Sequence, residues 1–403
     1  MINENFLILI FFLMVFKFTP RSFIGDQWAN TITEIFIFLS LIVMGFVNMK
    51  FRYNLNKVAW MLLTLIFLSQ LLWIRLYFGF QIDVKEQFNW LLYFLLYVVI
   101  VNILKNNNLD KKRIFNCFSL IIILNIAISL LSYMNESLFN IFNVLFETSK
   151  TAIIGSTYQR FSGTFSNPNF FGVFFSVIGS FVIIKLLNEK KKKISHLLYL
   201  FVIIYLINIS GSRSALISFV FLSVLVLFIS FFLNEKKSIS LKNLSIFFLI
   251  IASVFLTSFL LTTNLDTLTF SNLNTRFFNY ENIKVNFVGR INMTQGALDF
   301  FVKNPLMGVG PENDAYSSID NQYGKLLMES GVLVFLLFLI LLFYLLITRF
   351  RLFREEKDDL EKKVYFFTFI TTVALIINMF GAAIFSVTQL TSLYFFLLAL
   401  NKR

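Results

Sequence analysis

The sequence is poor in the residues that break helices, form disulfides and face water. Four prolines and 15 glycines among 403 residues leave little material for turns, so we expect long helices joined by short connections. A single cysteine, Cys117, excludes an internal disulfide. Charged residues make up only 14% of the chain, against about a quarter in an ordinary soluble domain. This low fraction excludes a soluble globular enzyme and a disordered chain.

The chain is instead rich in apolar side chains. Hydrophobic residues make up 58% of it and aromatic residues 18%, with 55 phenylalanines, and the mean hydropathy is +0.77. Such a chain has too few polar groups to cover a surface in water. We therefore predict an all-α, polytopic membrane protein. Because no internal repeat or separate soluble domain is recognisable, residues 1–403 are expected to form one membrane domain.

Twelve segments predict transmembrane helices, since each offers about 20 mostly apolar residues or slightly fewer. They are residues 4–22, 29–48, 58–78, 88–104, 114–134, 170–187, 195–210, 215–233, 244–263, 329–348, 364–385 and 388–400. Lys17 interrupts the first, and the last is short enough to form a re-entrant hairpin with its neighbour. The N-terminus lacks a basic region and a small-residue cleavage site, so we expect an anchor rather than a signal peptide.

The positions of lysine and arginine predict how the spans are oriented. Most of the 35 basic residues fall in alternate connections, as in the lysine run at 190–193. By the positive-inside rule these connections face the cytoplasm, together with both termini. This topology accounts for the net charge of +13 without a nucleic-acid partner.

Two of the connections that would face outward are long. The first covers residues 135–169, and the second covers residues 264–328, about 65 residues between the ninth and tenth spans. Loops of this length in a compact protein usually carry function. We therefore expect the chemistry to lie on the outer face, with part of the active site in the second loop.

Four arginines fall in connections that would face outward, where the positive-inside rule disfavours basic residues. They are Arg160, Arg213, Arg276 and Arg290. A guanidinium group is planar, permanently charged and suited to bidentate contact with phosphate or carboxylate, so an anionic ligand would explain their positions. The alternative is that an arginine near a helix end only extends to the membrane interface.

Local motifs explain the neighbours of these arginines better than the arginines themselves. Arg213 lies in SGSRS at 210–214, where capping of the next helix explains the serines but not the arginine. The Asn-Pro pair at 167–168 is a helix start signal. That signal leaves Arg160 and Asn169 unexplained.

The second long loop offers further candidates. Arg290 opens an amphipathic segment that we expect to lie along the membrane surface and to end at the Asn-Pro pair 304–305. Asp320 and Asn321 stand just before the tenth span. Because aspartate is a favoured helix cap, Asp320 is either a cap or a chemical group.

The sequence predicts no metal site and no cofactor. The sole histidine, His196, is expected on the cytoplasmic side, and no Asp-x-Asp pair of the kind that holds a metal on a sugar nucleotide occurs. Glu312 and Asp314 give only a weak cation signal. Neutralisation of phosphate would therefore fall to arginine.

At these motifs the chain resembles the O-antigen polymerase and ligase superfamily, the Wzy-type membrane glycosyltransferases. The matching pieces are GTFSNPN at 163–169, SRSA at 212–215, GR at 289–290, NPLMGVGP at 304–311, DNQY at 320–323 and MESGV at 328–332. Their order and spacing both match, over roughly residues 155–346. The first 150 residues contribute only the number of spans.

The resemblance implies a GT-C-like helical fold in a bacterial cytoplasmic (inner) membrane, with an outward active site. It implies an enzyme that takes glycans carried on a polyprenyl diphosphate. A polymerase of this kind joins lipid-linked repeat units into a surface polysaccharide such as O-antigen or capsule. It works without a sugar nucleotide, and a chain-length regulator and a flippase are the expected partners.

The resemblance also implies roles for the candidate residues. By motif position, Arg213 and Arg290 would stabilise the charge that grows on the diphosphate, and Asp320 would be the catalytic base. The implied substrate-binding residues are Arg160, Asn169, Arg276, Asn321 and Tyr323.

Two alternatives stay open. Family ligases, which transfer a finished glycan to a lipid or protein acceptor, tend to carry a histidine where this chain has Asp320, so the sequence favours a polymerase. A polysaccharide flippase or other transporter would be expected to carry charged or broken helices at mid-membrane. The predicted spans are nearly free of charge, and the polar groups gather in the outer loops.

Overall fold

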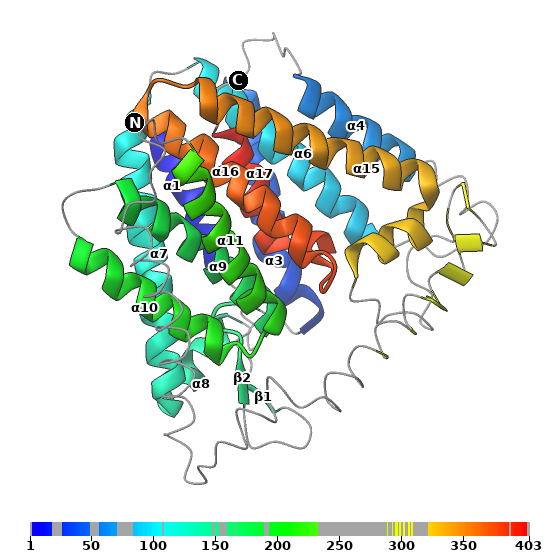
Figure 1. Ribbon diagram of the computed structural model, residues 1–403. Coiled ribbons are helices and arrows are strands. Elements are labelled where there is room, and N and C mark those ends of the chain that lie inside the picture. The colour runs from blue at the N-terminus through cyan, green and yellow to red at the C-terminus, as the bar shows by residue number, and fades with distance from the viewer. Residues whose placement is uncertain are drawn as a thin grey trace.

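The computed structural model describes eleven continuous stretches of the chain and a few isolated residues. The stretches are residues 2–17, 26–48, 56–70, 84–106, 109–146, 150–152, 159–165, 167–188, 193–232, 321–386 and 388–400. The isolated residues lie between 288 and 308. The described residues are nearly all helical (Figure 1), as the sequence predicts.

The helices follow the apolar segments of the sequence. They are α1 (Ile2–Val15), α3 (Asp26–Asn48), α4 (Lys57–Gln70), α6 (Val84–Asn106), α7 (Lys111–Met134), α8 (Glu136–Leu145), α9 (Pro168–Asn188), α10 (Lys193–Ile209), α11 (Arg213–Phe232), α15 (Gln322–Glu355), α16 (Asp359–Asn378) and α17 (Thr388–Ala399). The predicted span 244–263 lies outside the described residues. Every other predicted span overlaps one of these helices.

Five helices are long and apolar enough to cross a membrane by length and composition: α6, α7, α9, α11 and α15. Shorter apolar helices accompany them, among them α1, α4 and α10. Many large apolar side chains on these helices remain exposed, including Phe46 and Met134. An exposed apolar surface of this kind fits a helix bundle surrounded by lipid, so the structure supports a membrane protein.

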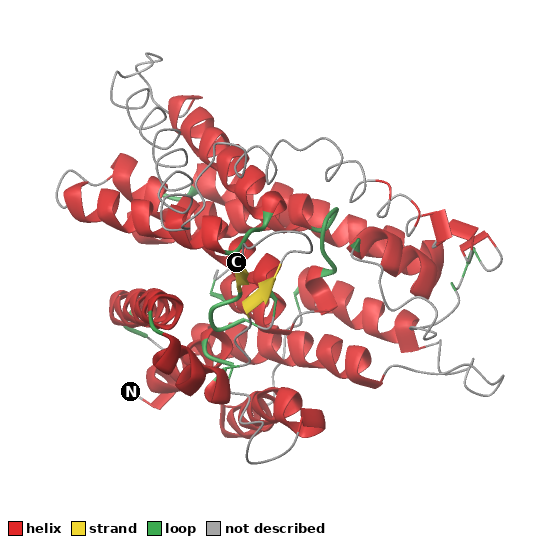
Figure 2. Ribbon diagram, turned by 90° about the horizontal axis from the view of Figure 1, so that it is seen from below, coloured by secondary structure: helices red, strands yellow, loops and turns green. Residues whose placement is uncertain are grey.

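The predicted loop at 135–169 contains secondary structure. It holds α8 and two short antiparallel strands, β1 (Lys150–Ala152) and β2 (Gln159–Phe161), with Thr151 opposite Arg160. Seen from below in Figure 2, the strands lie near the middle of this end of the bundle.

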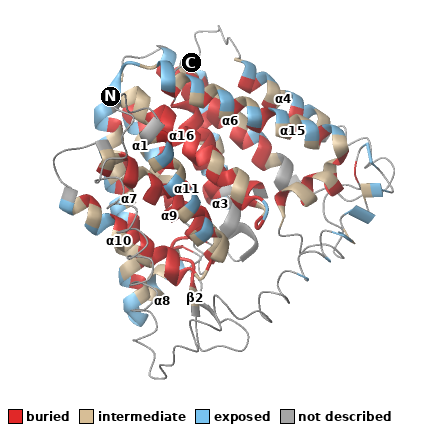
Figure 3. Ribbon diagram, viewed as in Figure 1, coloured by how far each residue is buried: buried red, intermediate tan, exposed pale blue. Residues whose placement is uncertain are grey.

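The C-terminal helix is the most enclosed element of the bundle. All described side chains from Gln389 to Ala399 are buried, and Figure 3 shows buried residues concentrated in α16 and its neighbours. Gln389 donates a hydrogen bond to the carbonyl of Val15 in α1 (2.8 Å). With 12 residues, α17 is about 18 Å long, which is less than the ~30 Å hydrocarbon core. A re-entrant course for this segment stays a prediction.

Helix α15 differs from the predicted tenth span at both ends. It begins seven residues before 329 and ends seven residues after 348. Arg349, predicted in a cytoplasmic connection, therefore lies inside this helix, where it is buried within electrostatic reach of the Tyr97 hydroxyl. Lys325 and Glu329 are also buried in α15. The predicted span 329–348 itself carries only Glu329, but the helix extends past both of its ends and so also includes Lys325 and Arg349.

Candidate functional site

Arg160 belongs to β2, which lies at the lower end of the bundle in Figure 1, and its side chain joins three segments. The half-buried side chain extends from β2. Its Nε donates a hydrogen bond to the carbonyl of Ser210 (3.1 Å), and its Nη2 donates one to Oδ1 of Asn169 (2.6 Å). The strand is thereby connected to the start of α9 and to the turn between α10 and α11. Hydrogen bonds from a charged donor hold such positions better than neutral ones.

The start of α9 is built by the predicted Asn-Pro signal. Pro168 is the first helical residue, and Oδ1 of Asn167 accepts a hydrogen bond from the backbone N–H of Asn169 (2.8 Å). One turn later, a Cβ on Gly172 would lie 2.8 Å from both the Ala215 Cβ and the Ser210 Oγ. This close approach, which needs glycine, sets the starts of α9 and α11 side by side.

The turn between α10 and α11 places Arg213 at the first position of α11. Gly211 has a positive φ of 63°, which reverses the chain within one residue. The predicted serine cap is confirmed, since the Oγ of Ser212 accepts a hydrogen bond from the backbone N–H of Ala215 (3.3 Å). Arg213 itself is half-buried. The structure thus brings Arg160, Asn169 and the Arg213 turn into one cluster.

Helix α16 connects this cluster to the start of α15. Asn378, the last residue of α16, donates a hydrogen bond to the Oγ of Ser218 in α11 (2.8 Å). The next residue, Met379, accepts a hydrogen bond from the backbone N–H of Gln322 (3.0 Å). The C-terminal end of α16 therefore contacts both α11 and the start of α15, while the N-termini of α9 and α11 lie side by side. Helix N-termini carry partial positive charge, so the paired starts of α9 and α11 favour an anion there.

At the start of α15, Asn321 and Tyr323, both predicted to bind substrate, make hydrogen bonds within the protein. The N-cap is Asn321, whose Oδ1 accepts hydrogen bonds from the backbone N–H groups of Tyr323 (3.0 Å) and Gly324 (3.5 Å). The Tyr323 hydroxyl donates to the carbonyl of Ile376 in α16 (2.9 Å). Both side chains thus have local structural partners, and their binding of sugar hydroxyls stays a prediction.

Three predicted residues cannot be placed. Arg276, Arg290 and Asp320 lie outside the described residues. Around Arg290, each described position from Val288 to Val302 is helical, as predicted, while its position along the membrane surface stays a prediction. Val302 in that segment is exposed.

The end of the second long loop packs directly against α15. The backbone N–H of Val332 donates to the carbonyl of Pro305 (2.9 Å). Gly331, at a break in α15 with φ of 74°, would place a Cβ 2.4 Å from the Leu306 carbonyl oxygen. Gly308, with φ of 66°, would place one 2.4 Å from the Met328 carbonyl oxygen. Two family-like motifs therefore form one contact, made of backbone against backbone.

Sequence reasoning missed a buried charged pair beside this contact. The Nζ of Lys325 lies 3.6 Å from Oε1 of Glu329, one turn apart in α15, and both side chains are almost fully buried. Buried charge within a membrane helix is a general signal of a functional site. Because the predicted span begins at 329, the prediction assigns Lys325 to the preceding loop, and the pair was not recognised.

Within the described part of the chain, no group of three or more His, Cys, Asp or Glu side chains is placed to hold a metal ion. The charged side chains that the structure places at the cluster of Arg160, Asn169 and the Arg213 turn are those of Arg160 and Arg213.

The Arg160–Asn169 contact predicts a measurable coupling. Because a hydrogen bond to a charged group contributes about 1.5–3 kcal/mol, Asn169→Ala should lower the free energy of unfolding in detergent by that amount. Adding Arg160→Ala should cost less than the two single effects combined. The control is Asn116→Ala at an exposed position. Additive losses in the double variant would contradict the contact.

Taken together, the fold and the cluster define a helical membrane protein with a cationic site at one end. Residues 198–339 match the family model described as O-antigen ligase, Wzy_C, and this match confirms the resemblance to the O-antigen polymerase and ligase superfamily. The match runs from α10 into α15 and includes Arg213, but it does not extend to Arg160 or Asn169. No curated protein matches the chain.

Proposed function

We propose that the protein is a membrane glycosyltransferase of the polymerase type. It would join polyprenyl-diphosphate-linked oligosaccharide repeat units into a surface polysaccharide at the outer face of a bacterial cytoplasmic membrane. The observation that carries the proposal is the cluster of Arg160, Asn169 and the Arg213 turn at the adjoining N-termini of α9 and α11. The family match supports the general class of reaction.

The cationic cluster suits the chemistry of a glycosyl diphosphate. The acceptor hydroxyl oxygen would bond to the anomeric carbon while the bond from that carbon to the diphosphate oxygen breaks. The bonding pair leaves with the diphosphate, so negative charge grows there, and the hydroxyl proton passes to a base. Arg213, together with Arg290, would stabilise that charge, because fixed cations in a partly dry site need no reorganisation.

Asp320 is the residue that the sequence analysis offers as the catalytic base. Asp320 immediately precedes Asn321, which occupies the N-cap of α15, so the cap role first considered for Asp320 is filled by its neighbour. We propose Asp320 as the base that accepts the acceptor proton. The presence of aspartate, where family ligases tend to carry histidine, favours polymerisation over transfer to a lipid or protein acceptor.

One structural feature keeps transport as a second candidate. Helix α15 is broken at Gly331 and carries the buried pair of Lys325 and Glu329, which are features that transporters use. These features lie within about 14 Å of the start of the helix rather than in its middle. Their position fits a lining of the outer site better than a transport path.

Deletion of the gene in its host, with and without complementation, separates the three functions on a surface-glycan gel. A polymerase predicts loss of the long ladder while one repeat unit still reaches its final acceptor. Polymer accumulating on its lipid carrier would instead show a ligase. Repeat units held at the cytoplasmic leaflet would show a flippase. Complementation with the intact gene should restore the ladder.

A further inference from the structure

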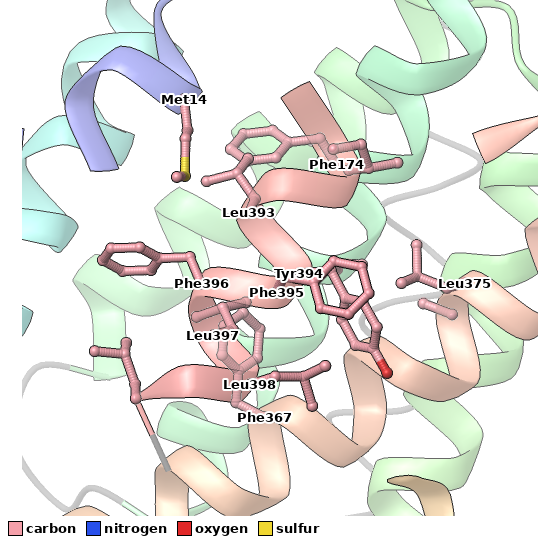
Figure 4. Close-up of a cluster of buried hydrophobic side chains, with 14 of the residues drawn as sticks. Met14, Phe174, Phe367, Leu375, Leu393, Tyr394, Phe395, Phe396, Leu397 and Leu398 are labelled. Carbon is pink, nitrogen blue, oxygen red and sulfur yellow. The ribbon is translucent and has the colours of Figure 1, made fainter. Parts of the chain in front are cut away.

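A cavity lies between α1, α7, α9, α16 and α17, away from the cluster of Arg160, Asn169 and the Arg213 turn. Its volume is about 220 Å³ and its walls are mostly apolar. Figure 4 shows part of the wall, including Phe174, Phe367, Leu393 and Leu397. These side chains come from α9 and from the two C-terminal helices α16 and α17. The interior is therefore suited to hydrocarbon and not to a sugar.

One part of this cavity is rimmed by cations. Lys112, Lys185 and Lys363 line it from α7, α9 and α16, and no aspartate or glutamate is among its described lining residues. The Lys185 ammonium lies 4.9 Å above the Phe181 ring. Lys363 pairs with Asp359 (2.7 Å), but that carboxylate is largely exposed, so water screens the pair. The cavity thus combines an apolar interior with a cationic rim.

The rim faces the opposite end of the bundle from the proposed active site. In α9, Lys185 follows Asn169 by 16 residues, which corresponds to about 24 Å along the helix. In α16, Lys363 precedes Asn378 by 15 residues, or about 22 Å. The diphosphate at the arginine cluster and an anion at this rim would therefore be different molecules or different groups. By the distribution of basic residues, this is the predicted cytoplasmic side.

We propose that this cavity binds one anionic phospholipid. The phosphate would lie among the three lysines, and one acyl chain would extend along the apolar wall toward Leu393. Apolar burial and attraction to anionic headgroups act together in such sites, and basic pockets between membrane helices are suited to lipid headgroups. The inference is independent of the proposed glycosyl transfer.

Lipid retention measures this binding directly. The full-length protein is purified in a mild detergent from membranes, exchanged into equal mixtures of phosphatidylglycerol and phosphatidylcholine with the same acyl chains, and analysed by native mass spectrometry. We expect one phosphatidylglycerol retained at least fivefold over phosphatidylcholine. Lys112→Gln, Lys185→Gln and Lys363→Gln combined should remove that preference, because the neutral amides keep the side-chain volume but lose the charge.

A matched control removes the same charge elsewhere at this end. Lys57, Lys105 and Lys357 are exposed and lie outside the cavity lining. Their combined change to glutamine should leave the preference for phosphatidylglycerol unchanged. This control separates the three rim lysines from the general attraction of a basic surface for anionic lipid.

A second variant tests the apolar part without altering charge. Ser119 lines the cavity, so Ser119→Trp should fill the path of the acyl chain and lower retention of phosphatidylglycerol at least fivefold. Equal retention of the two lipids by the unaltered protein would overturn the proposal. Full retention by the triple glutamine variant or by Ser119→Trp, or a polyprenyl phosphate retained in place of the phospholipid, would also overturn it.

Discussion

Arg213→Ala is expected to lower polymer formation by at least 100-fold while the protein still inserts into the membrane. Loss of one fixed charge-stabilising donor typically costs about 2.7–4 kcal/mol of transition-state stabilisation. Arg213 is suited to that role because a positive-φ turn at Gly211 and the Ser212 cap hold it at the first position of α11. The measurement is the length distribution of surface glycan on a gel, with membrane insertion followed by blotting.

Arg213→Lys distinguishes charge from geometry. A lysine keeps the positive charge but cannot make a planar, bidentate contact with a diphosphate, so we expect this variant to fail as well. Arg290→Ala should behave like Arg213→Ala. Arg354→Ala, an exposed position at the other end of α15, is the matched control and should give a normal ladder. Normal chain lengths in Arg213→Ala would refute the assigned role.

Gly331→Ala is expected to lower stability by about 3 kcal/mol and to reduce polymer formation at least tenfold. A residue with a side chain at φ of 74° costs about 1–3 kcal/mol in backbone strain alone. The added Cβ would also lie within 2.6 Å of Leu306 and Gly308 backbone atoms, which cannot rotate away. Thermal unfolding in detergent measures the first effect, and the surface-glycan gel measures the second.

Two other glycines provide controls for Gly331→Ala. A Cβ at Gly296 would meet nothing within 4 Å, and one at Gly45 would make only an ordinary contact of 3.6 Å with Val99. Alanine at these helical positions should be neutral or stabilising by up to about 1 kcal/mol, since alanine favours helix. If Gly331→Ala unfolds at the same temperature as Gly296→Ala, the contact between the loop end and α15 is not formed.

The predictions for Arg213 and Gly331 concern two sites that α16 connects. The Arg213 turn is fixed by α9, α11 and β2, whereas the end of the second long loop is fixed by Gly331 in α15. Because α16 bonds to both α11 and α15, displacement of the loop end would change the surroundings of the cationic cluster. Gly331→Ala therefore tests whether a remote backbone contact supports the site.

Hydropathy and local signals in the sequence determined the class of the protein and many helix boundaries. Long apolar runs are sufficient to predict membrane helices, because a bilayer imposes one length and one polarity on every span. The Asn-Pro start of α9 and the serine cap of α11 are equally local, since each depends on hydrogen bonds within a few residues. Motif order was sufficient to predict the resemblance to the O-antigen polymerase and ligase superfamily, which the match over residues 198–339 confirms.

Only the tertiary structure decided which polar residues meet. Arg160 bonds to Ser210, 50 residues away, and nothing in the local pattern of either residue predicts that contact. The tertiary structure also showed that Asn321 caps α15 and that Gly308 packs against the break in α15 at Gly331. Hydropathy predicts that a segment lies in the membrane. It does not predict which helices pack together, because apolar helices have similar hydropathy. Which helices become neighbours depends on close packing of particular side chains and backbones, which only the folded bundle specifies.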